Sequence, residues 1–182
     1  GAAVGGAGIG AGRCPPPGWL WNARPSRSAR STARAKWATS PSNSTTGVRS
    51  IGWRADAPAT LVWAEAQDGG DPAREAAVRD AVFMQAAPFA DGPVKLAELA
   101  SRYGGITWGR GDLALLDEYW WKTRRARTWR IRPDQPAQAP ALIVARSFEV
   151  RYSDPGEPVT VADANGRQRL LTSADGGSLF RI

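Results

Sequence analysis

The sequence of 182 residues contains no histidine, one cysteine and one methionine. Without an imidazole, no Ser–His–Asp triad can be completed within these residues. The single cysteine, Cys14, excludes an intramolecular disulfide, and we assign it no chemistry. No apolar run reaches the roughly 18 residues of a membrane-spanning helix, so we expect no membrane partner. Because Met84 is the only methionine, we expect a processed protein or a fragment.

Acidic residues are absent from residues 1–50, which contain seven arginine and lysine side chains. The remaining 17 basic residues balance the 17 acidic ones, so the net charge of +7 comes from this first part alone. The basic balance therefore does not describe the rest of the chain. A neutral surface with mixed charges is that of an ordinary soluble domain.

Residues 1–45 are rich in Gly, Ala, Arg, Ser and Pro, a composition that predicts a disordered, basic segment. Its glycines do not have the G-x-G-x-x-G spacing of a dinucleotide-binding loop, and we predict no cofactor. A transit peptide and a basic arm for nucleic acid remain alternatives. We favour sequence that is not native, because off-frame GC-rich DNA encodes this composition.

Two stretches, 51–65 and 106–118, are imperfect copies of each other. Three pairs of residues recur: Ile51 and Ile106, Trp53 and Trp108, Asp56 and Asp112. The first two pairs are 55 residues apart and the third is 56 apart. Each copy predicts a strand, a tight turn held by Asp, and a second strand. A repeat made entirely of strands indicates the blades of a β-propeller, in which no blade buries its own apolar face.

At this spacing the chain holds roughly three blades, whereas propellers close with about four to eight. We therefore predict an all-β fold: a partial, unclosed β-propeller of roughly two to three blades over residues 46–182. Bare strand edges should make the isolated chain marginally stable or prone to aggregate.

Alternation of apolar and polar residues locates the strands. They are predicted at Val48–Trp53, Thr60–Ala66, Arg79–Ala86, Val94–Leu99, Leu113–Tyr119, Arg127–Arg132 and Ala141–Val144, with another starting at Gly104 and a final pair at Gly166–Ser173 and Gly177–Ile182. We expect Trp53, Trp108, Trp129 and Ile131 to face the core.

Segment Trp120–Arg132 has six cations and three tryptophans in 13 residues. This interleaving is typical of single-strand nucleic-acid binders. A hairpin with its tryptophans in the core and its arginines in solvent has the same pattern. We favour the hairpin and do not expect nucleic acid as a partner.

Carboxylates offer two further candidate sites. Asp68, Asp71, Glu75 and Asp80 lack the spacing of an EF-hand loop, and we expect solvated loop carboxylates there instead of a cation site. The adjacent pair at 117–118 should point to opposite faces of a strand and so not share a substrate. We therefore predict no catalytic, cofactor-binding or metal-binding residue.

Four stretches carry a resemblance to a known family: GWRADAPATLVWAEAQDGGDP, DAVFMQAAPF, GGITWGRGDLALLDEYWWKTRRARTW and RSFEVRYSDPGEPV. Together they resemble the propeller region of glutamyl endopeptidases in the prolyl oligopeptidase family of serine peptidases, over about residues 46–182. The resemblance does not extend to residues 1–45, which supports a break near residue 46.

The resemblance implies a propeller that filters peptides on their way to an α/β-hydrolase domain, where Ser on a G-x-S-x-G elbow, Asp and His cleave after Glu. No G-x-S-x-G occurs here. The implied function is that of a non-catalytic propeller fragment, with the missing hydrolase domain as partner and peptides as the parent's substrates. One of Arg124, Arg125 and Arg127 could then attract an acidic side chain. The alternative is a stand-alone β-rich module that binds nucleic acid or an acidic partner through 13–49 and 120–132.

Overall fold

Residues 46–182 are described by the computed structural model, and they form ten strands and two short 3-10 helices. The strands are β1 (Val48–Trp53), β2 (Thr60–Ala66), β3 (Asp80–Ala86), β4 (Val94–Leu99), β5 (Arg102–Arg110), β6 (Leu113–Trp120), β7 (Arg125–Ile131), β8 (Ala141–Ser147), β9 (Thr160–Ala162) and β10 (Gln168–Leu170), and the 3-10 helices are Trp121–Thr123 and Arg151–Ser153. The predicted disorder of 1–45 and the passenger role of Cys14 lie outside these residues.

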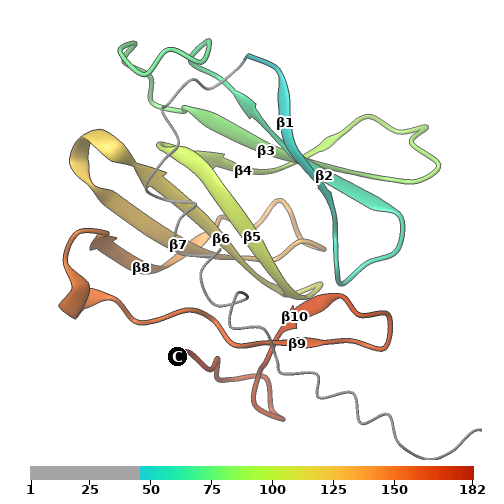
Figure 1. Cartoon of the computed structure of the whole chain (residues 1–182). Helices are drawn as coiled ribbons and strands as arrows, with labels where there is room; N and C mark the ends of the chain where they lie inside the picture. Colours follow the sequence, from blue (N-terminus) through green and yellow to red (C-terminus); the bar gives the residue numbers. More distant parts are fainter. Residues whose placement is uncertain (1–45) are drawn as a thin grey trace, which may run out of the picture. The chain divides into compact units, whose positions relative to one another are not determined.

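Two four-stranded antiparallel sheets follow each other along the chain (Figure 1). Sheet A has the order β1-β2-β3-β4 and sheet B the order β5-β6-β7-β8, so each strand pairs with its neighbour in sequence. Strands β9 and β10 form a third, two-stranded sheet. None of the sheets closes on itself. The predicted all-β, unclosed fold is confirmed, and two successive four-stranded meanders are the arrangement expected of consecutive blades.

The C-terminal strand pair differs from the prediction. Strand β10 pairs with β9 and not with residues 177–182, which make only an isolated bridge between Thr172 and Leu179. The turn between β9 and β10 is built by Asp163, whose Oδ1 accepts hydrogen bonds from the backbone N–H groups of Asn165 (2.8 Å) and Arg167 (2.9 Å). This short Asp-closed turn competes successfully with the turn that was predicted further along.

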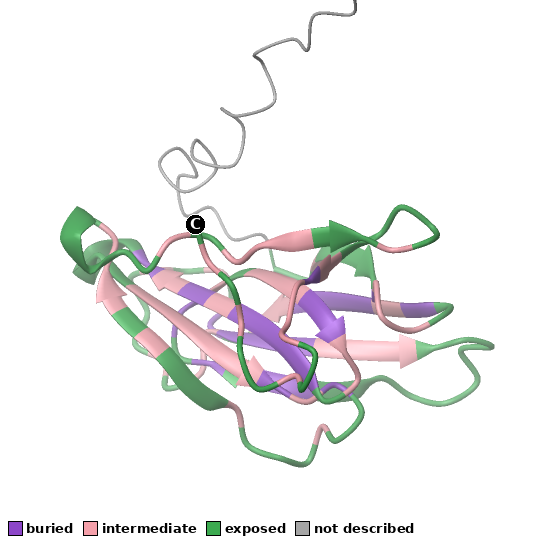
Figure 2. Cartoon of the chain, turned by 90° about the horizontal axis from the view of Figure 1, so that it is seen from below, coloured by how far each residue is buried: buried purple, intermediate pink, exposed green. Residues whose placement is uncertain are grey.

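The main core lies between sheets A and B. Sheet A presents to it a face that we call the inner face, which carries Val62, Val82, Ala97 and Leu99. Sheet B contributes Trp108, Ala114, Leu116 and Ile131 from one face, with Trp129 half-buried beside them. A smaller cluster on the other face of sheet B joins Leu113, Leu115 and Leu170. Buried residues therefore follow the middle of the sheets, and exposed ones gather in the loops (Figure 2).

Trp53 contradicts its predicted place in the core, because 58% of its surface is exposed. Its repeat partner Trp108 is only 9% exposed, as predicted. Trp53 points to the outer face of sheet A, which also carries Val48 and Ile51, and both of these are more than half exposed. The difference has a physical reason: sheet A covers Trp108, whereas no described strand covers the outer face.

Candidate functional site

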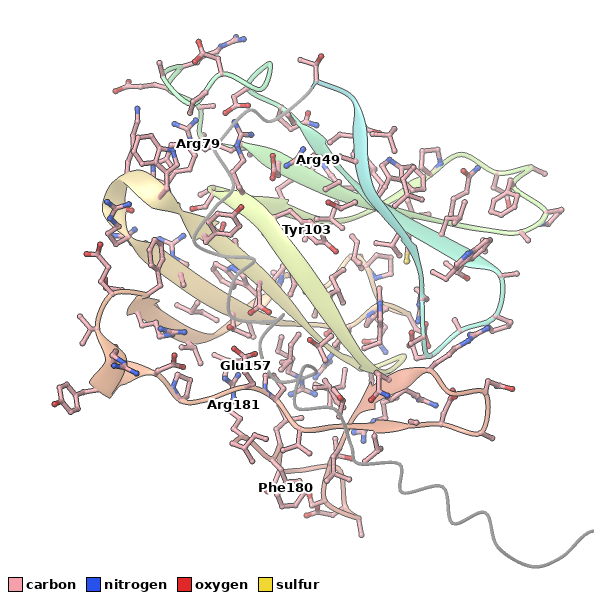
Figure 3. All side chains as sticks on the ribbon, in the orientation of Figure 1. Arg49, Arg79, Tyr103, Glu157, Phe180 and Arg181 are labelled. Carbon is pink, nitrogen blue, oxygen red and sulfur yellow. The ribbon has the colours of Figure 1, made fainter. Side chains whose placement is uncertain are left out.

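Five charged side chains meet where β3 and β5 begin, and we call them the ionic cluster. They are Arg49, Asp68, Arg79, Asp80 and Arg102. Arg102 Nη2 lies 2.6 Å from Asp68 Oδ2, and its Nη1 lies 2.9 Å from Asp80 Oδ1. Arg79 also pairs with Asp68, at 2.8 Å, and Arg49 pairs with Asp80. The labelled side chains of Arg49 and Arg79 lie near Tyr103 of β5, so the cluster ties sheet A to the start of sheet B (Figure 3).

Both carboxylates of the cluster are fully buried and receive several hydrogen bonds. The backbone N–H of Tyr103 donates to Asp80 Oδ2 at 2.6 Å, and that of Gly70 donates to Asp68 Oδ1 at 3.0 Å. A buried charge is tolerated only with such partners. The indole of Trp120 adds a further contact, since the guanidinium of Arg79 lies 4.0 Å from its ring centroid. These features indicate a structural link between the sheets.

The predicted solvated carboxylates are therefore wrong at two of four positions. Asp68 and Asp80 are buried in ion pairs, whereas Asp71 and Glu75 are exposed as predicted. Sequence reasoning missed the pairs because Asp68 and Arg102 are 34 residues apart. The only local signal is the Arg79–Asp80 dipeptide at the start of a strand.

Acid should weaken the fold through Asp68. Burial opposes ionisation of Asp68, but the hydrogen bonds from Arg102, Gly70 and Arg79 outweigh it and hold the pKa below its usual range. A carboxyl whose pKa is depressed by folding stabilises the protein above its unfolded pKa of about 3.9, and this contribution disappears as pH falls through the folded pKa. We expect the free energy of unfolding, measured in urea, to drop below about pH 4 in the wild type, and to drop less in Asp68→Asn. Equal pH dependence of the two proteins would contradict this prediction.

Asp117 provides a matched control of the opposite sign. Burial raises the pKa of Asp117, the nearby Glu157 raises it further, and the hydrogen bond from Thr128 Oγ1 (2.6 Å) only partly offsets them. A raised pKa means that the stabilisation is present below the unfolded pKa and is lost as pH rises through the folded pKa. Asp117→Asn should therefore preserve or increase the free energy of unfolding near neutral pH.

Glu118 forms a second link between the sheets. Its carboxylate accepts hydrogen bonds from the backbone N–H of Ser101 (3.0 Å), from Arg127 Nη1 (2.9 Å) and from Trp129 Nε1 (3.2 Å). Ser101 lies in the connection between β4 and β5, so Glu118 fixes the entry to sheet B. Asp117 binds Thr128 instead, which confirms that the adjacent carboxylates point to opposite faces.

A groove of about 460 Å³ lies beside β7 and β8, and we call it the cationic groove. It is lined by Thr123, Arg125, Arg127, Leu142, Ala145, Arg146 and Ser147. Two of its arginines are compensated: Arg127 by Glu118, and Arg146 by Asp154, whose Oδ2 lies 3.0 Å from Arg146 Nη2. Arg125 is exposed and makes no ion pair with the described part of the chain. The groove can thus offer one free guanidinium to an anion.

The cations and tryptophans of 120–132 do not follow one simple pattern. Trp120 is buried and Trp129 is half-buried, as the hairpin interpretation requires, but Trp121 is 41% exposed. Arg127 was predicted in solvent and instead binds the buried Glu118. Arg124 pairs with Glu149 at 2.9 Å. A stacking platform for a nucleic-acid strand needs successive exposed aromatic rings, and here one of the three is exposed by more than a third.

The two Asp-containing turns of the repeat hold arginines. Arg54 Nη2 lies 2.8 Å from Asp56 Oδ2, and Arg110 Nε donates to Asp112 Oδ1. Each motif therefore reads Arg-x-Asp, with the ion pair closing the turn that sequence reasoning assigned to Asp alone. Arg54 is 5% exposed and also reaches Asp134, 2.9 Å away.

Among residues 46–182, no group of three or more His, Cys, Asp or Glu side chains is arranged to hold a metal ion. Within the same residues, no helix has the length and apolarity needed to cross a membrane. The ionic cluster, Glu118 and the cationic groove are thus the polar features from which a role can be argued.

Comparison with known proteins finds two plant relatives, each named "Probable glutamyl endopeptidase, chloroplastic". The Arabidopsis thaliana protein is 54% identical over 112 residues, which are 60% of this chain and 12% of that protein. The Oryza sativa subsp. japonica protein is 47% identical over 122 residues, 66% of this chain and 13% of that protein. No family model matches the chain, and no solved structure matches it. The chain is a homologue of proteins named glutamyl endopeptidase and spans only 12–13% of their length.

Proposed function

We propose that this chain is a non-catalytic β-propeller segment of a serine peptidase of the prolyl oligopeptidase family, one that cleaves peptide bonds after glutamate. The observation that carries the proposal is the 47–54% identity to proteins named glutamyl endopeptidase. The lack of histidine supports a non-catalytic role, because the triad's general base cannot come from these residues. The consecutive, unclosed sheets A and B support the assignment to a propeller.

In this proposal the segment contributes to gating. The propeller limits which peptides reach the α/β-hydrolase domain of the same protein, and the chemistry belongs to that domain. The cationic groove supports a preference for acidic peptides, because Arg125 is exposed and uncompensated. A fixed cation raises the local concentration of anionic substrates without taking part in the reaction.

Peptide hydrolysis tests the proposal in two arms. The purified 182-residue chain should not hydrolyse a fluorogenic peptide with glutamate before the scissile bond, because it has no general base. A hybrid of the Arabidopsis relative, with residues 46–182 of this chain in place of its corresponding segment, should hydrolyse it. The same peptide with glutamine in place of glutamate is the control. A folded hybrid without glutamate-directed cleavage, or cleavage by the chain alone, would sink the proposal.

A stand-alone binding module is the second candidate, favoured by the free guanidinium of Arg125. Electrostatic binding of a fluorescent single-stranded oligonucleotide should weaken at least about tenfold between 50 and 200 mM salt, and Arg125→Ala should weaken it further. Polyglutamate is the matching probe for an acidic protein partner. No binding of either probe at 50 mM salt removes this candidate.

A further inference from the structure

The two tryptophans of the repeat have the same place in their sheets and opposite environments. Trp53 lies on β1 and Trp108 on β5, the first strand of sheet A and of sheet B. Each pairs with an early residue of the next strand, Trp53 with Leu61 and Trp108 with Ala114. Yet Trp53 is 58% exposed and Trp108 is 9% exposed. The sequence pattern is equal, so the difference must come from what covers each residue.

Trp108 is covered by sheet A. The inner face of sheet A supplies branched and small side chains, including Val62, Val82 and Ala97. The guanidinium of Arg54 completes the cover, since its Cζ lies 5.6 Å from the centroid of the Trp108 ring. Arg54 is held there by Asp56. The Arg-x-Asp turn of one sheet thus reaches forward to the tryptophan of the following sheet.

The second Arg-x-Asp turn also reaches forward. Arg110 follows Arg54 by 56 residues, and Asp112 follows Asp56 by the same interval. A Cβ on Gly176 would lie 2.5 Å from Arg110 Nη1, so the guanidinium packs against this glycine, which has a φ of +70°. Gly176 lies beyond β10, in the part of the chain that follows sheet B. Both turns therefore place an arginine on the next structural unit along the chain.

We propose that the outer face of sheet A is an interface for a further four-stranded antiparallel sheet of the same longer protein. That sheet presents an apolar face of valine and alanine to Ile51 and Trp53, and an Arg-x-Asp turn whose guanidinium stacks on the Trp53 ring. The internal repeat supplies the reason, because the one tryptophan of this kind that has a neighbouring sheet is covered in this way. The proposal concerns packing and stands whether or not the longer protein cleaves peptides.

Other occupants fit the face less well. Residues 1–45 contain only Val4, Ile9 and Leu20 as aliphatic side chains larger than alanine, too few for an inner face like that of sheet A. The curated relatives are much longer, since the matched regions are 12–13% of their length, and this leaves ample sequence for another sheet. The exposed face also explains itself as an interface, because contiguous apolar patches on a soluble protein mark contact sites.

The first test uses the full 182-residue chain. Acrylamide quenching of tryptophan fluorescence, compared between wild type and Trp53→Phe, isolates the emission of Trp53. Quenching of this component should be several-fold stronger than that of the component lost in Trp108→Phe. A Trp53 component that is protected in the chain alone would overturn the proposal, because another part of the same chain would then cover the face.

The second test uses the hybrid with the Arabidopsis relative, with a photo-crosslinking benzoylphenylalanine in place of Trp53. The cross-link is expected within the same polypeptide, to a peptide that contains Arg-x-Asp. The matched control is the same amino acid at Tyr152, which is fully exposed and should give no such product. A cross-link to a second copy, no cross-link, or a hybrid that cannot fold because the segment does not fit contradicts the proposal. Cross-linking without peptide hydrolysis would support the interface and count against the proposed function.

Discussion

Trp108→Ala should destabilise the protein by about 3–5 kcal/mol, the usual cost of truncating a buried aromatic side chain. The indole fills the core between sheets A and B, and its loss leaves a cavity beneath Arg54. Trp53→Ala, at the repeat-related position, should change stability by no more than about 0.5–1 kcal/mol, because Trp53 is 58% exposed. The two variants lose the same side chain from the same place in a β-strand, so they differ only in burial.

Urea unfolding followed by far-ultraviolet circular dichroism measures both variants without relying on tryptophan fluorescence. The expected result is a large drop in the midpoint for Trp108→Ala and a small one for Trp53→Ala. Equal losses would mean that Trp53 is buried in solution. That outcome would contradict the arrangement of the outer face described above.

Arg102→Ala is expected to cost about 3–5 kcal/mol, because removing one partner leaves the other charge buried without compensation. Arg102 bridges Asp68 and Asp80, and both carboxylates are fully buried. No other described cation contacts both of them. The loss should therefore loosen sheet A from sheet B as well as reduce the overall stability.

Lys95→Ala is the matched control for Arg102→Ala. It removes the ion pair between Lys95 and Glu98, whose side chains are 52% and 49% exposed. Exposed pairs contribute about 0–1 kcal/mol, so this variant should unfold close to the wild type. A similar stability for the two variants would show that the ionic cluster is not the link between the sheets.

Much of the fold follows from local patterns. The bounds of β1, β2 and β4 agree with the prediction, because each strand alternates apolar and polar residues and ends at a Gly-, Pro- or Asp-rich turn. The repeat also predicted two sheets of the same plan. The final strand pair was misplaced, since two turns of similar composition compete there and only the contacts of Leu170 with sheet B decide between them.

The polar features could be predicted only in part. Asp56 and Asp112 were located at turns, but the arginines that bind them were not identified. The ionic cluster joins a loop, the start of β3 and the start of β5, and no local pattern brings these together. Trp53 shows the same limit: its pattern is that of a core residue, and its exposure depends on which sheet packs against it, which is a long-range property.

The most direct measurement for the central claim is the sequence of the full-length transcript that encodes this chain. The account predicts a reading frame that continues past Ile182 into G-x-S-x-G, followed by Asp and His with the order and context of an α/β-hydrolase domain. It also predicts, upstream of Thr46, a further all-β repeat with an Arg-x-Asp turn. A transcript that ends at Ile182 and encodes neither feature would contradict the assignment to a peptidase and favour a separate binding module.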